Sequence, residues 1–100
     1  MNIELRDILQ AVCLETGISE AEMQHRTRKW QIADARGLFY VVAKEYGFKD
    51  VEVAAVTGRE RTTPITVGKH YRGYIEHGYK PLVRLYNGIK VRLNEKRTNE

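Results

Sequence analysis

Gly58-Arg59-Glu60-Arg61-Thr62-Thr63 is the stretch that decides the fold, because it joins two segments that both have helical patterns. The segment before it begins at Asp50, a residue that can cap a helix, and Gly58 can adopt the positive φ that ends one. After it, Pro64 is compatible with the first turn of a second helix, where no amide hydrogen bond is lost. A short helix, a turn containing glycine and a second helix form the pattern of a helix-turn-helix.

Apolar side chains at three- and four-residue intervals predict further helices on both sides of this stretch. No segment has a convincing strand pattern, so we expect an all-α fold of five to six helices. The helices expected outside the helix-turn-helix are a first one from Ile3 to Gly17, a short one capped by Ser19, a central one from Ile32 to Tyr46, and a sixth over Leu82 to Leu93.

The helix after the turn should begin at Glu60 or Arg61 and continue to about Tyr74. Two further glycines and Pro81 predict a loosely ordered connection after it, and the polar residues 94–100 should fray. We therefore divide the chain into a helix-turn-helix domain, residues 1–78, and a C-terminal extension, residues 79–100, that either packs on the same domain or serves association. The residues of the fifth helix expected to face the core are Ile65, Val67, Tyr71 and Tyr74.

Length and composition favour one soluble domain. The chain has 100 residues, of which 42% are apolar, enough for a single core. The only cysteine, Cys13, excludes a disulfide framework and is expected to be a small core residue, as in a reducing cytoplasm. No apolar run approaches the roughly 18 residues that span a bilayer, and the N-terminus lacks an apolar signal region. We expect a cytoplasmic protein without a membrane partner.

The charge balance suits a polyanionic partner. Lys and Arg total 17 against 13 acidic residues, and the formal net charge is +4. The first residues of a recognition helix read bases in the major groove, where Arg pairs with guanine, Glu accepts from cytosine, and Thr contacts phosphate or the thymine methyl. The alternative is that these side chains form a solvated surface with a simple helix cap. The residues of this segment expected to contact DNA are Arg59, Glu60, Arg61, Thr62, Thr63, Thr66 and Lys69.

A second cationic segment lies just before the central helix. Arg26, Arg28 and Lys29 form a basic loop, and Arg36 follows about one turn into the next helical segment. Such a loop can lie along the phosphate backbone or enter the minor groove. Trp30 is expected to pack as a lid over the core rather than to stack on a base.

The order of these elements resembles the C-terminal DNA-binding domain of the bacterial replication initiator DnaA, which has a Trp-repressor-like helical fold. That family has a capped short helix, a basic loop, a long helix that opens with an arginine, and a Gly-Arg-Asp-His-Thr-Thr signature. The counterparts here are residues 19–23, residues 26–29, Arg36 and residues 58–63, within a resemblance that spans about residues 4–75. It implies sequence-specific binding to duplex DNA by Arg59, Thr62 and Thr63, with further contacts from Arg36 and the basic loop.

Several residues depart from the family pattern. The Asp-His pair is replaced by Glu60-Arg61, an apolar position by Pro64, and Asp34 places an acid where the family is basic. The DNA sequence bound by the family therefore cannot be transferred to this chain. The chain also has no Gly-x-x-x-x-Gly-Lys-Ser/Thr loop, so no ATP site is expected.

Other functions receive less support from the sequence. The three histidines are not at ligand spacing on one helix face, and no serine or cysteine lies beside an evident base, so we expect no enzyme, metal or cofactor. The main alternative is a protein interaction module that has lost DNA recognition and uses the sixth helix for a partner or a homodimer. A third reading is single-stranded nucleic-acid binding through stacking tyrosines, namely Tyr71, Tyr74, Tyr79 and Tyr86.

Overall fold

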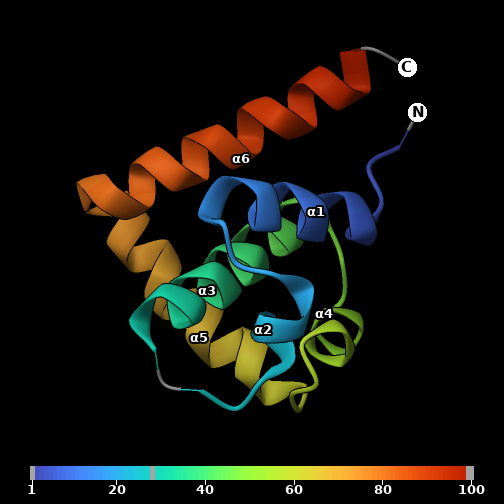
Figure 1. The fold of residues 1–100 in the computed structure, drawn as a ribbon, viewed down its shortest axis with the longest axis vertical. Helices are drawn as coiled ribbons and strands as arrows, with labels where there is room; N and C mark the ends of the chain where they lie inside the picture. The colour runs from blue at the N-terminus through green and yellow to red at the C-terminus, as the bar shows by residue number, and fades with distance from the viewer. Residues whose placement is uncertain (1, 28, 99–100) are drawn as a thin grey trace.

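The chain folds into helices, as the sequence predicts. The computed structural model describes residues 2–27 and 29–98, and these residues contain six helices and no strand. The fold is therefore all-α (Figure 1). The helices are α1 (Leu5–Thr16), α2 (Glu20–Gln24), α3 (Trp30–Glu45), α4 (Asp50–Val56), α5 (Thr62–Glu76) and α6 (Lys80–Thr98).

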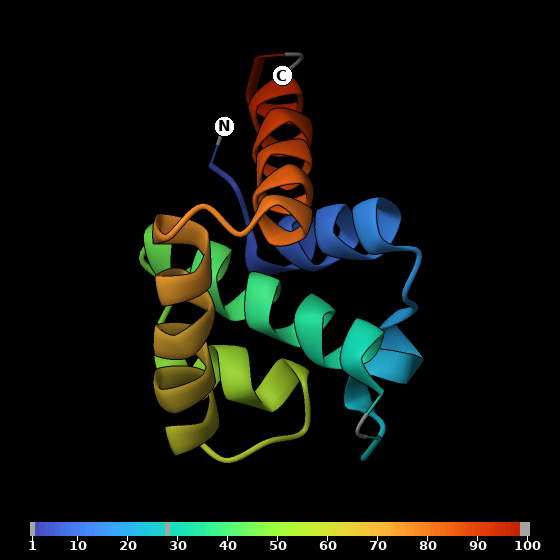
Figure 2. The same cartoon turned by 90° about the vertical axis from the view of Figure 1, so that its left-hand side faces the viewer.

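Helix α3 is the centre of the fold. All its residues from Ala35 to Ala43 are buried, which is the property of a helix covered on every side. Figure 2 shows α3 crossing the middle of the molecule, with α5 along one side and α1 and α6 above it. The core is formed where Leu38, Phe39 and Val42 of α3 meet the apolar stripe of α1 and the inner faces of the other helices.

Capping residues and glycines determine several helix ends at the positions that the sequence predicts. Ser19 forms the predicted capping box with Glu22: the Glu22 amide donates to Ser19 Oγ at 3.1 Å, and the Ser19 amide donates to Glu22 Oε1 at 3.0 Å. Gly58 has a φ of 65°, which lets the chain reverse after α4. One predicted cap is wrong, because Asp50 is the first residue of α4 and Lys49 occupies the cap position without a side-chain bond. Helix α5 begins at Thr62, close to the start that Pro64 in its first turn predicts.

Two predicted core residues of α5 face solvent instead. Ile65 is 46% exposed and Tyr74 is 50% exposed. The inner face of α5 is formed by Pro64, which is buried, and by partly buried residues three and four positions apart after it. Ile65 stands about 100° around the helix from Pro64 and so misses the core. Tyr74 lies near the end of α5, where it lines a groove with Trp30 and Tyr79. The prediction that Trp30 packs over the core is also wrong, because this side chain is 68% exposed.

The C-terminal extension packs on the same domain. A short turn through Gly78 replaces the predicted loose connection, and α6 then buries Leu82, Ile89 and Leu93 against α1 and α3. Residues 94–98 continue this helix and do not fray, while residues 99–100 lie outside the described part. The apolar stripe of α6 that suggested a docking surface is therefore used inside the molecule. Figure 1 shows α6 lying along α1.

Ion pairs between helices hold α6 in place. Lys96 Nζ lies 3.0 Å from Asp7 Oδ1, and Arg92 Nε lies 2.5 Å from Glu15 Oε2. A Cβ atom at Gly88 would overlap the Glu15 carboxylate, so glycine leaves room for this side chain between α1 and α6. Helix α6 is thereby fastened along its length, and not only by its apolar residues.

The remaining predictions concern Cys13 and the membrane. Cys13 is half-buried, and its Sγ lies 3.9 Å from the sulfur of Met23, where burial raises the pKa of the thiol. No helix in the described part of the chain combines the length and apolar character needed to cross a bilayer.

Candidate nucleic-acid interface

The connection between α4 and α5 is anchored to the central helix. Thr57 is fully buried, and its hydroxyl donates to the Ala54 carbonyl at 3.2 Å. The Thr57 oxygen also lies 2.8 Å from the hydroxyl of Tyr40 on α3. Because the Thr57 hydrogen is directed at the Ala54 carbonyl, Tyr40 is the donor in this pair. Burial raises the pKa of Tyr40, so its phenol is protonated at neutral pH and available to donate. The turn that carries the arginines is thus fixed by a buried hydrogen bond to α3.

Arg36 holds the basic loop in place through hydrogen bonds to backbone carbonyls. Its side chain is only 9% exposed, and its Nε donates to the Met23 carbonyl at 2.7 Å. Its two terminal nitrogens donate to the carbonyls of His25 and Thr27. Burial, followed by repulsion from Arg59, lowers the pKa of Arg36, but a guanidinium keeps its charge in proteins. The structure therefore gives Arg36 a positioning role for the loop.

Arg59 reaches the same loop from the α4–α5 connection. Its Nη2 donates to the His25 carbonyl at 2.8 Å, and its Nη1 donates to the Thr57 carbonyl at 2.8 Å. Arg36 and Arg59 thus share the His25 carbonyl, although the three residues come from different parts of the chain. Gln24 adds a further tie, because its side-chain amide donates to the Val56 carbonyl at 3.0 Å. These bonds join the basic loop to the end of α4.

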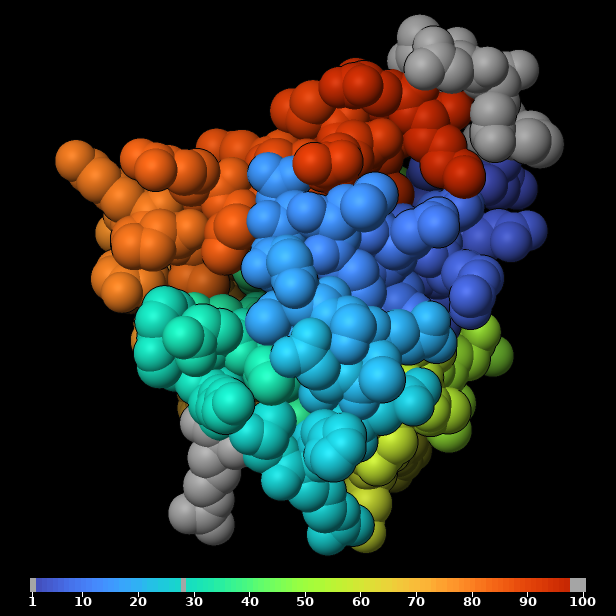
Figure 3. Space-filling view, in the orientation of Figure 1, coloured from blue at the N-terminus to red at the C-terminus, as the bar shows by residue number. Residues whose placement is uncertain are grey.

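The result is an open groove of about 630 Å³ between the basic loop and the start of α5. Figure 3 shows the surface of the loop beside that of α4 and the connection after it. Several predicted site residues meet here, although the sequence places them in two separate segments. The groove is lined by Arg26, Thr27, Arg36, Gly58, Arg59, Glu60 and Thr63.

The other predicted residues lie around this groove or beyond it. Arg61 and Thr62 are exposed where α5 begins. Thr66 and Lys69 are exposed on the next two turns, on the same side as Thr62. Lys29 is exposed at the start of α3 but does not line the groove, and the predicted contact at residue 28 lies outside the described residues.

The structure adds two cations that the sequence reasoning missed. Lys44 and Arg72 line a second groove of about 240 Å³ between α3 and α5, together with Lys69 and the exposed Ile65. Arg72 follows Lys69 by three residues, and this spacing on one helix is the signal that could have found it. Lys44 carries no such signal, because it belongs to another helix.

The histidines do not form a metal centre. Within residues 2–27 and 29–98, no three His, Cys, Asp or Glu side chains are grouped closely enough to hold a metal ion. His25 contributes its backbone carbonyl to the arginine bonds, and His77 lines a different groove near the end of α5.

Comparison with known proteins adds no relative. No protein-family model matches the chain, and a search of curated proteins also gives no match. The similarity to the replication initiator domain therefore stays a prediction from the residues.

Proposed function

We propose that the protein binds double-stranded DNA through a Trp-repressor-like helix-turn-helix formed by α4 and α5. The observation that carries this proposal is the pair of guanidinium groups, Arg36 and Arg59, that share the His25 carbonyl and so join the basic loop to α3 and to the α4–α5 connection. This arrangement gathers cations from two distant segments beside the exposed beginning of one helix. A helix presented in this way fits the major groove, and adjacent cations fit the phosphates that border it.

The roles of the side chains follow from their exposure. Arg61, Thr62 and Thr66 project from the first turns of α5 and are assigned to base edges, with Glu60 and Thr63 at the rim of the groove. Exposed cations on either side of them are assigned to phosphates, where they give affinity but little sequence preference. The residues assigned to phosphate contacts are Arg26, Lys29 and Lys69.

Arg36 and Arg59 receive a different role from the other arginines. Their donors are directed at carbonyl groups of the protein, so they hold the loop in the position that lets Arg26 meet the DNA backbone. The helix dipole of α5 strengthens the attraction, because the N-terminal end of a helix carries partial positive charge. Arg59 lies at this end and remains partly exposed, so it also contributes positive electrostatic potential at the groove.

Fluorescence anisotropy with a labelled duplex tests the proposal. The protein should bind random-sequence duplex at low ionic strength, and its affinity should fall steeply as salt is added, because counterions are released from the phosphates. Lys69→Ala should lower the slope of log K against log salt by about 0.9. Arg97→Ala is the matched control, because it removes the same charge from the far end of α6, which Figure 2 places opposite the start of α5.

Sequence preference is measured separately, by selecting bound duplexes from a random pool. Arg61→Ala and Thr66→Ala should reduce discrimination between selected and random duplexes, and each base interaction that is removed should cost about 1–3 kcal/mol. Absence of salt-sensitive binding to any duplex at low ionic strength would reject the proposal. Equal effects of Lys69→Ala and Arg97→Ala would reject the assigned face.

A further inference from the structure

An aromatic groove lies at the other end of α5, away from the arginines. It has a volume of about 640 Å³ and is formed where the start of α3, the end of α5 and the start of α6 meet. Every aromatic side chain that is exposed in residues 2–27 and 29–98 lines it: Trp30 is 68% exposed, Tyr79 57% and Tyr74 50%. Exposed aromatic rings gathered in one concavity indicate a binding surface rather than scattered surface residues.

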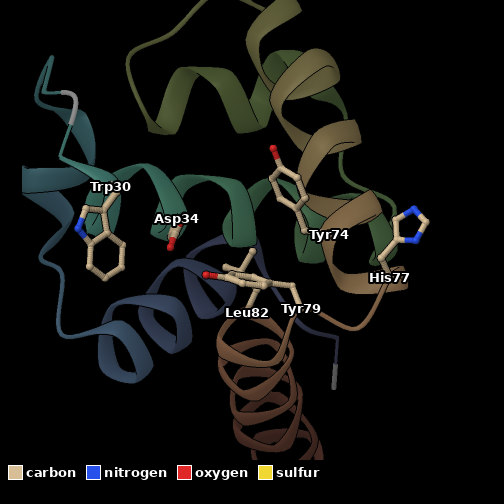
Figure 4. Close-up of a pocket in the computed structure, with 6 residues that line it drawn as sticks. All are labelled: Trp30, Asp34, Tyr74, His77, Tyr79 and Leu82. Atoms are coloured by element: carbon tan, nitrogen blue, oxygen red, sulfur yellow. The ribbon is translucent and has the colours of Figure 1, made fainter.

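A carboxylate lies among these rings. Figure 4 shows Asp34 between Trp30 and the two tyrosines, with the Tyr79 ring beside Leu82 and its hydroxyl end directed toward Asp34. Asp34 Oδ1 accepts a hydrogen bond from the Tyr71 hydroxyl at 2.7 Å. In the described part of the chain, Asp34 has no cationic partner, whereas the carboxylates of Asp7, Glu15 and Glu45 all form ion pairs.

Tyr71 supports one side of this groove from behind. The Tyr71 and Tyr74 rings meet edge to face, with their centroids 5.4 Å apart and an interplanar angle of 80°. Tyr71 is also packed against the backbone of α3, because a Cβ atom at Gly37 would overlap its ring. The hydroxyl of Tyr71 therefore orients Asp34 while its ring supports Tyr74.

We propose that this groove binds a small organic cation, an ammonium group carried on an aromatic or aliphatic body. An ammonium between ring faces gains cation–π attraction, and the half-buried Asp34 carboxylate supplies the missing countercharge. The body of the ligand covers Leu82 and the ring of Tyr79. A nucleotide fits less well, because its phosphate would approach an unpaired carboxylate of the same sign.

The single tryptophan provides a direct test, since Trp30 is the only one in the chain and lines the groove. The purified protein is titrated with 2-phenylethylammonium, with the neutral isostere 2-phenylethanol and with phenylacetate, and the emission of Trp30 is recorded. The ammonium should give a saturable change, and the alcohol should bind about fivefold more weakly. Phenylacetate should give no saturable change.

Two variants test whether the Asp34 charge and the Tyr79 ring contribute to binding. Asp34→Asn keeps an acceptor for Tyr71 but loses the charge, so the affinity for the ammonium should fall to that for the alcohol. Tyr79→Ala removes an exposed ring without touching the core and should also weaken binding of the ammonium. Glu52→Gln, which neutralises an exposed carboxylate on α4, is the matched control and should leave the affinity unchanged.

Each other outcome overturns the inference. Equal binding of ammonium and alcohol would show a purely apolar groove, and tighter binding of phenylacetate would show an anion site. An absence of saturable change with all three ligands would show that the groove is not a site. This groove shares no lining residue with the proposed DNA interface, so the result is independent of duplex binding.

Discussion

Replacing Arg36 by lysine separates the positioning role of this residue from its charge. The guanidinium of Arg36 donates to carbonyls at three places, and an ammonium on a shorter, more flexible chain cannot reach them together. Arg36→Lys keeps the net charge of the protein. Any loss of stability therefore reports the bonds to the loop and not the electrostatic field.

The size of the effect follows from the individual bonds. The bond from Nε to the Met23 carbonyl is buried and 2.7 Å long, and a hydrogen bond to a charged group contributes about 1.5–3 kcal/mol. The bond to the Thr27 carbonyl is 3.4 Å long and contributes little, while the His25 carbonyl keeps its bond from Arg59. We therefore expect Arg36→Lys to lower the free energy of unfolding by about 2–3 kcal/mol.

Urea unfolding followed by far-ultraviolet circular dichroism measures this loss. Arg26→Lys, on an exposed side chain of the same loop, is the control and should change the free energy of unfolding by less than about 0.5 kcal/mol. In the absence of urea, Arg36→Lys should weaken duplex binding and lower the salt slope by up to about 0.9, because Arg26 is then no longer held at its phosphate. A variant as stable as the parent, or one whose affinity for duplex and salt slope are both unchanged, would refute the positioning role.

Three further predictions follow from the packing of the helices. Gly37→Ala should destabilise the fold by about 1–3 kcal/mol in a thermal melt despite the better helix propensity of alanine, because the new Cβ overlaps the Tyr71 ring. Gly73→Ala, where a Cβ has no neighbour within 4 Å, should instead stabilise it by up to about 1 kcal/mol, and a loss would show that α5 is packed differently. Burial, and then its hydrogen bond to Glu45 at 2.6 Å, raises the pKa of Tyr86 to about 12, so the neutral phenol is favoured in the folded state. The stabilisation that Tyr86 contributes should be complete below about pH 10 and be lost as the pH rises toward 12. Urea unfolding over this range should show that the free energy of unfolding falls less steeply with pH for Tyr86→Phe than for the parent.

Much of the secondary structure could be predicted from the sequence because its signals are local. The capping box at Ser19 needs only a hydroxyl and a carboxylate three residues apart, and Gly58 needs only freedom at positive φ. The stripe of Leu82, Ile89 and Leu93 predicts an amphipathic helix by spacing alone. Spacing did not predict which surface that helix covers, and α6 proved to pack on α1 of the same domain.

The site was less predictable than the helices. Val67 and Tyr71 pack against the core as predicted. Ile65 is exposed because Pro64, one residue earlier, takes the inward position. Tyr74 is exposed because it lies in a groove at the end of α5. Trp30 is exposed in the same way, at the edge of a groove that three helices form together. Whether a given position is buried depends on which neighbouring helix faces it. Apolar spacing within one helix does not determine this.

The sequence by itself determined the helices, the turn through Gly58 and the two cationic segments, because hydrogen bonds and apolar periodicity within a helix involve residues at most a few positions apart. Only the tertiary structure decided that Arg36 and Arg59 share the His25 carbonyl and that Asp34 lies among aromatic rings with a hydrogen bond from Tyr71. The reason is geometric: the partners of a guanidinium or a carboxylate are fixed by the packing of whole helices. Residues 11 and 34 positions apart along the chain meet at one carbonyl only after that packing is complete.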